Sequence, residues 1–416
     1  MNKIEKAALK MASLSVYKGF LNRTVPAALQ RLLWAADNSP REFLEAWGDL
    51  FSALCAHGAS ENFAGYLTEL PFYEENAFSL AAAGGAEEFP PVVKAAAKRD
   101  LQIILELSSL TPDELIRCCS FPDEVSCADL PKWKNGLPVE ILRGDPEDCF
   151  CRMRDYYRKN GCGMYARYRA FIWRGGTIIP VEHPDQTTFA DLKGYETQRN
   201  MAIENTQAFL SGLPANNCLL YGDRGTGKSS TVKALLNEFY GQGLRVIEMP
   251  KEHLMDFPAL ADRIAALPMK FIVFIDDLSF SREDDTYASL KAVLEGGLAA
   301  RPENTLIYAT SNRRHLLRET FSDRAGDEIH LGDTIQESLS LADRFGLSIN
   351  FMLPDKAQFL EIVRQLAVQR GLENDLGELE TGAERWATQR GGRSPRCARQ
   401  YIRFAESRIR RGKSIL

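Results

Sequence analysis

A glycine-rich segment between two apolar segments carries the residue types of a phosphate-binding loop. The segment YGDRGTGKSS, residues 221–230, fits the spacing G-x-x-x-x-G-K-[ST]. Glycines let backbone N–H groups wrap closely around a β-phosphate, and a following helix adds its partly positive N-terminus. The lysine supplies charge for the β- and γ-phosphates, and the first serine hydroxyl is a ligand for Mg²⁺. The candidate phosphate-binding residues are Gly222, Asp223, Arg224, Gly225, Thr226, Gly227, Lys228, Ser229 and Ser230.

Two adjacent carboxylates, Asp276 and Asp277, end the apolar segment KFIVFIDD. A carboxylate at the C-terminal end of a strand beside a phosphate loop is placed to anchor Mg²⁺, and we assign this role to Asp276, with Ser229 as the second metal-binding residue. Asp277 would then face the γ-phosphate, where an acid orients or deprotonates the attacking water. The alternative, two acids that start a solvated turn, is weakened by the glycine-rich loop.

Asn312 ends the apolar segment NTLIYATSN. An amide at the tip of a strand between the two phosphate-binding elements could hold the attacking water, although an Asn in this position is usually a turn former. We favour the functional role because of the neighbouring elements.

Two further arginines could contact nucleotide phosphates, one in a neighbouring subunit and one in its own subunit. Arg344, in SLADRFGLSINFML, ends a predicted helix and could reach into the site of a neighbouring subunit, with Arg324 as the competing candidate. The alternative for Arg344 is a favourable contact with its own helix dipole. Arg396, in GGRSPRCARQYIRF, lies in the first turn of a predicted helix. Because the helix dipole disfavours a cation there, we expect a γ-phosphate partner rather than a plain surface role.

Apolar segments and helical segments alternate around these residues. CLLY, LRVIEM, KFIVFID, NTLIYAT and LSINFML read as five strands separated by helices, which implies a parallel sheet covered on both faces. We predict a nucleotide-binding α/β core over 171–354, in which 171–190 form a linker and a strand or hairpin. A helical lid with a basic C-terminus follows over 355–416.

Residues 1–170 show apolar side chains at helical spacing, which predicts a mainly α-helical N-terminal domain. TPDELIRCC opens with a capping threonine followed by a proline at the first helical position. The sequence shows no catalytic constellation in this domain, so its role stays open.

The 416 residues are 45% apolar and 26% charged, as in an ordinary soluble protein. Neither a run of about 18 uncharged apolar residues nor a secretory signal is evident, and we expect no membrane span. Nine cysteines without paired metal-ligand spacing are expected to be reduced thiols in a cytoplasm.

The formal charge of −5 hides a basic C-terminus. From 385 to 416 the only acid is Glu406. Such a segment could bind phosphate, nucleic acid or an acidic partner, or could be a solvated helix face. We find no RNA-binding signature and no helix-turn-helix after the lid. Nucleic acid is therefore possible but not favoured. The basic residues are Arg385, Arg390, Arg393, Arg396, Arg399, Arg403, Arg408, Arg410, Arg411 and Lys413.

These parts, in this order, resemble AAA+ ATPases, and the segment 180–230 is more specifically similar to a bacterial AAA+ family known as domain of unknown function 815. The resemblance covers roughly Val181 to the C-terminus. The resemblance implies an αβα core with a helical lid, ATP with Mg²⁺, and assembly into rings or spirals. In LKGYETQ it implies that Gly194 and Tyr195 belong to the adenine pocket, although Tyr195 could equally be a packed aromatic. Many AAA+ proteins have Glu where this chain has Asp277, which puts fast hydrolysis in doubt.

The leading functional hypothesis is a homo-oligomeric ATPase with slow turnover that remodels or loads a macromolecular partner bound through the N-terminal domain. One alternative is a binding or scaffold module gated by ATP with little turnover. Another is a nucleic-acid-associated ATPase resembling initiators and loaders, which we rank lower.

Overall fold

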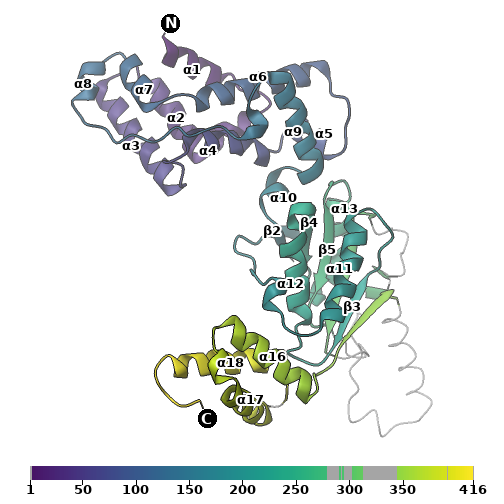
Figure 1. Cartoon of the computed structure of the whole chain (residues 1–416). Coiled ribbons are helices and arrows are strands. Elements are labelled where there is room, and N and C mark those ends of the chain that lie inside the picture. Colours follow the sequence, from purple (N-terminus) through teal and green to yellow (C-terminus); the bar gives the residue numbers. More distant parts are fainter. Residues whose placement is uncertain are drawn as a thin grey trace. The chain divides into compact units, whose positions relative to one another are not determined.

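The structure is a computed structural model, and it describes residues 2–278, 290–291, 293–294, 302–312, 344–390 and 392–415. The chain divides into two compact units, Met1–Arg167 and Tyr168–Leu416 (Figure 1). Arg324 lies outside the described residues. Within the described part of the chain, helices long and apolar enough to cross a membrane are absent.

The first unit is helical and encloses one apolar core, with fully buried Trp47 and Phe63 among its largest side chains. The expected cap at Thr111 is confirmed, because its side chain accepts a hydrogen bond from the backbone N–H of Glu114 and Pro112 follows it. The helices are α1 (Lys3–Ala12), α2 (Thr24–Ala35), α3 (Pro40–Ala56), α4 (Phe63–Glu69), α5 (Ala77–Ala83), α6 (Pro91–Ser108), α7 (Pro112–Cys118), α8 (Pro122–Ser126), α9 (Pro146–Asn160) and α10 (Gly163–Arg167), with 3-10 turns at Lys18–Asn22, Leu70–Tyr73 and Glu140–Leu142.

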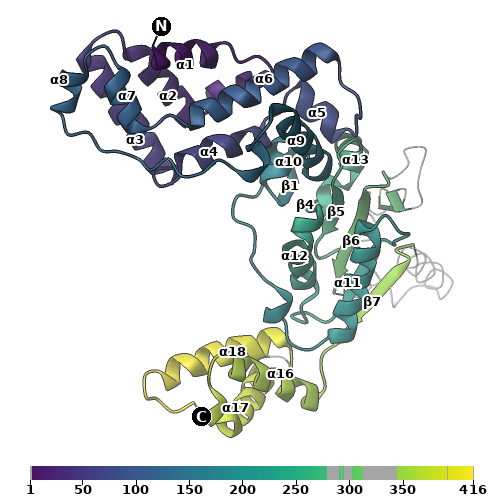
Figure 2. The ribbon, with the colours of Figure 1, turned by 45° about the horizontal axis from the view of Figure 1, so that its top comes forward.

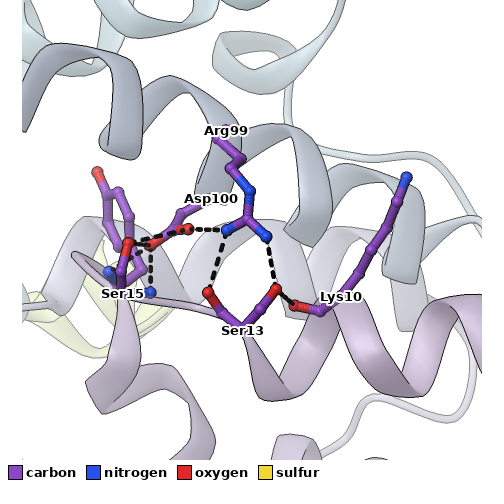
Figure 3. Close-up of polar contacts among 6 residues, drawn as sticks. Lys10, Ser13, Ser15, Arg99 and Asp100 are labelled. Atoms are coloured by element: carbon purple, nitrogen blue, oxygen red, sulfur yellow. Dashed lines mark hydrogen bonds and ion pairs between the residues drawn. The ribbon is translucent and has the colours of Figure 1, made fainter. Parts of the chain in front are cut away.

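A buried carboxylate on α6 fixes the segment that follows α1 (Figure 3). Asp100, which is 0% exposed, accepts hydrogen bonds from the backbone N–H groups of Ser15 and Tyr17 at 2.8 and 3.1 Å. The neighbouring Arg99 donates to Asp100 and to the Ser13 carbonyl. A charge removed from water needs such partners, so these bonds secure the packing of α1 against α6.

A seven-stranded sheet forms the centre of the second unit, in the order β2-β1-β4-β5-β6-β3-β7. Only the β1–β2 pair among these strands is antiparallel. The five predicted strands are all present, and the residues predicted as a strand or hairpin extend the sheet by β1 and β2. The strands are β1 (Ala170–Arg174), β2 (Thr177–Pro180), β3 (Cys218–Gly222), β4 (Leu244–Glu248), β5 (Lys270–Ile275), β6 (Thr305–Ser311) and β7 (Leu347–Phe351).

The sheet positions the ends of β3, β5, β6 and β7 along one edge. β3 lies between β6 and β7, with Leu220 opposite Thr310 and Gly222 opposite Phe351. β5 pairs with β6, with Ile275 opposite Ala309. Because the carboxyl ends of parallel strands meet at one edge, residues that follow these strands are neighbours.

Helices lie against the sheet (Figure 2). Helices α11 and α12 share one apolar cluster with it, which includes Phe209, Val232 and Phe274. This arrangement confirms the predicted fold class. The helices of this part are α11 (Glu196–Leu210), α12 (Lys228–Phe239) and α13 (Phe257–Ile264), with 3-10 turns at Phe189–Asp191, Tyr240–Gln242 and Lys251–Asp256.

Three helices after β7 form the lid and pack around their own core, which includes Phe359, Leu379 and Tyr401. Ser394 caps the last helix by accepting a hydrogen bond from the backbone N–H of Cys397, and Pro395 occupies its first turn. The lid helices are α16 (Lys356–Gln369), α17 (Leu376–Gln389) and α18 (Pro395–Ile409), with a 3-10 turn at Glu373–Asp375.

Candidate active site

The glycine-rich loop joins β3 to α12 in backbone conformations that favour glycine. Gly222, Gly225 and Gly227 have φ angles of 132°, 79° and 101°. A Cβ on Gly222 would lie 2.3 Å from the carbonyl oxygen of Phe351 on β7. The loop therefore needs glycine both for its conformation and for its close approach to the neighbouring strand. Since α12 begins at Lys228, its N-terminal N–H groups face the loop.

Lys228 is only 7% exposed, although it carries an ammonium group. Its Nζ donates to the carbonyl oxygens of Gly222 at 2.8 Å and Asp223 at 2.7 Å, and lies 3.4 Å from Oδ1 of Asn312. Burial disfavours the charged form and lowers the pKa of Lys228 to about 8, despite the opposing effect of nearby carboxylates. The hydrogen bonds of Nζ go to neutral oxygens, and the carboxylates act on it only through their charge. A bound polyphosphate would give this ammonium a direct anionic partner.

The lowered pKa of Lys228 predicts a pH dependence for the binding of ATP, the ligand expected from the sequence. The ammonium loses its proton as the pH rises through about 8, so affinity for labelled ATP should fall above that pH. The fall should approach about tenfold per pH unit, since one proton must then be taken up on binding. Fluorescence anisotropy of a labelled ATP across this range measures it. In Lys228→Arg the guanidinium stays charged, so its affinity should not follow this profile. An unchanged wild-type affinity well above pH 8 would contradict the assignment.

The acid pair lies at the end of β5, beside the phosphate loop. Oδ1 of Asp276 accepts hydrogen bonds from the hydroxyls of Ser229 at 2.6 Å and Thr310 at 2.5 Å. A carboxylate and a serine hydroxyl at this distance are oxygen ligands of the kind that Mg²⁺ takes together with phosphates. The residues present therefore fit the predicted metal.

Asp277 has a left-handed backbone, with φ of 53°, a conformation that Asp tolerates better than most residues. Its N–H donates to the Thr310 hydroxyl at 2.9 Å. Oδ1 of Asp277 accepts a hydrogen bond from Nδ2 of Asn312 at 2.5 Å. The turn thus directs the second carboxylate towards the amide at the end of β6, and Asn312 connects Asp277 with Lys228.

Gly194 and Tyr195, in the segment before α11, contact the end of β7 and the lid. Tyr195, with φ of 60°, donates its hydroxyl to the carbonyl of Met352 at 2.5 Å, and its ring centroid lies 5.4 Å from that of Phe351. Burial raises the pKa of Tyr195, so it remains a neutral donor. Gly194 contacts the lid closely, because a Cβ there would lie 2.9 Å from Cδ1 of Ile362.

The lid meets the phosphate loop at Gly225. Its carbonyl accepts a hydrogen bond from the backbone N–H of Arg396 at 3.1 Å, and a Cβ on Gly225 would lie 3.1 Å from that of Arg396. The first turn of α18 is thereby held against the loop. Residues 396, 399, 400 and 403 follow helical spacing and place one face of α18 on the cavity.

These elements enclose a cavity of about 720 Å³. Cavities that bind small molecules measure about 300–1,000 Å³. Cationic side chains outnumber acidic ones among its walls, as an anionic ligand requires. The lining residues are Leu192, Lys193, Gly194, Tyr195, Arg199, Arg224, Gly225, Thr226, Gly227, Lys228, Ser229, Ser230, Thr231, Asp276, Asp277, Thr310, Asn312, Phe351, Pro395, Arg396, Arg399, Gln400 and Arg403.

The structure brings most of the sequence-predicted residues together, with three exceptions among the described ones. Gly222 and Asp223 belong to the loop but do not line the cavity. Oδ2 of Asp223 accepts a hydrogen bond from the N–H of Leu353 at 2.7 Å. Arg344 lies in the turn before β7 and is outside the described cavity wall. A role in a neighbouring subunit therefore stays a prediction.

Several wall residues were not predicted from the sequence. Arg199 is only 8% exposed and pairs with Glu196 at 3.1 Å. Arg399 donates to the carbonyl of Asp191 at 3.0 Å, which joins α18 to the segment before α11. The helical spacing of Arg396, Arg399 and Arg403 was a signal in the sequence, but without the position of the lid it did not indicate the cavity.

A mostly parallel sheet with this phosphate loop after β3, acids after β5 and a helical lid on the loop has the arrangement that the resemblance to AAA+ proteins implies. A family model described as protein of unknown function DUF815 matches residues 166–409, and the chain belongs to that family. The predicted similarity to this family is thus confirmed.

Solved structures of RuvB from Thermotoga maritima are similar to this chain. The structure described as the Holliday junction branch migration motor has 14% sequence identity and a TM-score of 0.37, and the match covers 55% of this chain and 67% of that chain. A point mutant of the same protein has 13% identity and a TM-score of 0.36, over 54% and 66%. Identity and TM-scores this low support no inference about activity.

Proposed function

We propose that this protein is a Mg²⁺-dependent ATPase that works as a homo-oligomer to remodel or load a macromolecular partner. The observation that carries the proposal is the single cavity that joins the phosphate loop, the acids after β5, the amide after β6 and the lid arginine. Three further points stay predictions. They are binding to an unknown protein through the N-terminal unit, assembly into a ring or spiral, and a cytoplasmic location.

Each residue in the cavity has a chemical task in this proposal. Lys228 holds the β- and γ-phosphates, and Ser229 and Asp276 hold Mg²⁺, which neutralises charge on the phosphates. Asp277 orients the attacking water or accepts its proton. Asn312, which the sequence suggested as a holder of that water, instead fixes the Asp277 carboxylate through the 2.5 Å hydrogen bond. Arg396 adds positive charge from the lid.

Gly194 and Tyr195 would lie beside the base. The Tyr195 hydroxyl is already bonded to Met352, so the ring rather than the hydroxyl would contact a nucleotide. The adenine pocket therefore depends on the packing of Tyr195 and on the Gly194 backbone.

The rate of turnover distinguishes this ATPase from an ATP-gated binding module. The short side chain of Asp277, bonded to Asn312, favours slow hydrolysis. If ATP and ADP gave different oligomers while turnover stayed negligible, the binding module would be the better description.

Phosphate release measured against protein concentration, with light scattering on the same samples, tests the proposal. We expect specific activity to rise with concentration if Arg344 of one subunit completes the site of the next. Arg344→Ala should bind labelled ATP as the wild type does but stay at the activity of dilute protein. A specific activity independent of concentration, with wild-type activity in Arg344→Ala, would contradict the shared site.

A further inference from the structure

The surface of the lid carries a row in which two aromatic side chains lie between two arginines. The guanidinium of Arg390 lies 4.1 Å from the ring centroid of Trp386. The Trp386 ring lies 4.9 Å from that of Phe404, with 34° between the planes. The Arg408 guanidinium lies 5.5 Å from the Phe404 centroid. We name these four residues, which come from α17, α18 and the residue after α17, the lid strip.

The lid strip remains accessible to solvent. Phe404 is 39% exposed, although an aromatic ring of this size is usually buried. Arg390 is also exposed, and Trp386 and Arg408 are half-buried. A ligand can therefore reach the Phe404 ring and the guanidinium planes without unfolding the lid.

The segment of chain that carries most of the lid strip is rich in basic residues. Glu406, the only acid from 385 to 416, accepts from Arg370 at 2.8 Å and from Arg410 at 2.6 Å, so its charge is already neutralised. The exposed basic residues nearby in the sequence are Arg385, Arg403, Arg411 and Lys413. An anionic ligand would find several cations beside stacking surfaces.

We propose that the lid strip binds single-stranded nucleic acid. Surfaces that hold unpaired strands combine basic side chains for the phosphates with aromatic rings on which bases stack, and guanidinium planes stack on bases as well. In a duplex the bases are already stacked on one another, so they could not use the exposed Phe404 ring. An acidic polypeptide would need the arginines but would gain nothing from the aromatic rings.

The same helix serves the lid strip and the nucleotide cavity. Arg403 lines the cavity, and Phe404 follows it about 100° further around α18. The backbone of Arg396, at the start of this helix, is bonded to Gly225 of the phosphate loop. A strand bound at the lid strip would therefore contact the element that closes over the nucleotide. The proposal needs no ATP hydrolysis, so it can fail independently of the proposed activity.

Fluorescence anisotropy of a labelled oligo(dT) of about 20 nucleotides with the full chain, without nucleotide, tests the inference. We expect saturable binding that weakens about tenfold or more between ~50 and ~200 mM salt, as three or so phosphate contacts require. Phe404→Ala should weaken binding about tenfold, since it removes a stacking surface. Arg408→Gln should weaken it severalfold.

Arg364→Gln is the matched control, because it also removes one exposed lid charge but lies on α16, paired with Glu380 and Glu361. Its affinity should stay within about twofold of the wild type, as for a paired surface charge. Unchanged thermal midpoints and labelled-ATP affinity show that each variant is folded. The proposal is overturned by absent binding at low salt or by wild-type affinity in Phe404→Ala. It also fails if duplex DNA binds equally well, or if polyglutamate displaces the strand as effectively as unlabelled oligo(dT), which would indicate an acidic protein partner.

Discussion

Lys228→Ala is expected to lower kcat/KM for ATP by about 10³- to 10⁵-fold. A hydrogen bond to a charged partner contributes about 1.5–3 kcal/mol, or roughly 10- to 100-fold in affinity. Loss of a cation that stabilises charge in the transition state costs a further 10²- to 10³-fold or so in turnover. Lys228 combines both effects because it is buried beside the loop. Among the described cavity-lining residues, it is the only lysine on α12, so no neighbouring lysine of that helix can replace it. Phosphate release and labelled-ATP binding measure the two contributions separately.

The variant should remain folded. It replaces a desolvated ammonium with alanine, a good residue at the start of a helix, so we expect no fall in the thermal midpoint. Lys233→Ala is the matched control, since Lys233 lies on the same helix, is exposed and pairs with Asp185 at 3.1 Å. Wild-type turnover in Lys233→Ala is expected. Wild-type turnover in Lys228→Ala would remove the phosphate loop from the catalytic account.

Asp277→Asn is expected to reduce turnover by about 10²- to 10⁴-fold while ATP still binds. The substitution removes the carboxylate that orients or deprotonates water but keeps its shape. Asn also tolerates the left-handed backbone that residue 277 adopts, with φ of 53°, so the turn after β5 should persist. Steady-state phosphate release and labelled-ATP affinity, measured on the same preparation, give the two quantities.

Asp276→Asn is the informative comparison for this second prediction. Asp276 accepts the Ser229 and Thr310 hydroxyls, and we assign it to Mg²⁺. Its variant should therefore lose the increase in ATP affinity that Mg²⁺ gives, whereas Asp277→Asn should keep it. If the two variants exchanged these behaviours, the metal-binding and water-activating roles would have to be exchanged as well.

The fold could be predicted largely because its strands are buried on both faces. KFIVFI and TLIYATS form β5 and β6 as nearly continuous buried segments, and such runs identify parallel strands without knowledge of their partners. The hairpin of β1 and β2 was also visible. Its membership of the sheet was not, because that depends on pairing between Phe171 and Ile247, which are far apart in the sequence.

In the candidate site, too, some residues could be predicted from the local sequence and others could not. The phosphate loop was predictable because its glycines, lysine and serine have a characteristic spacing within ten residues. The acids and the amide were predictable because they follow parallel strands whose carboxyl ends are neighbours. Arg199 could not be predicted, because its place depends on how α11 lies beside the phosphate loop, and Arg399 could not, because its position depends on how the lid docks. That docking rests on the contacts of Gly225 with Arg396 and of Gly194 with Ile362, which join distant parts of the chain.

The central claim is that the cavity between the phosphate loop and the lid binds ATP with Mg²⁺. Isothermal titration of the wild-type chain with ATP, with Mg²⁺ and then with the metal chelated, tests it most directly. We predict saturable binding of one nucleotide per chain that weakens when Mg²⁺ is removed. Absence of saturable binding in both conditions, from a protein whose thermal unfolding shows that it is folded, would contradict the account.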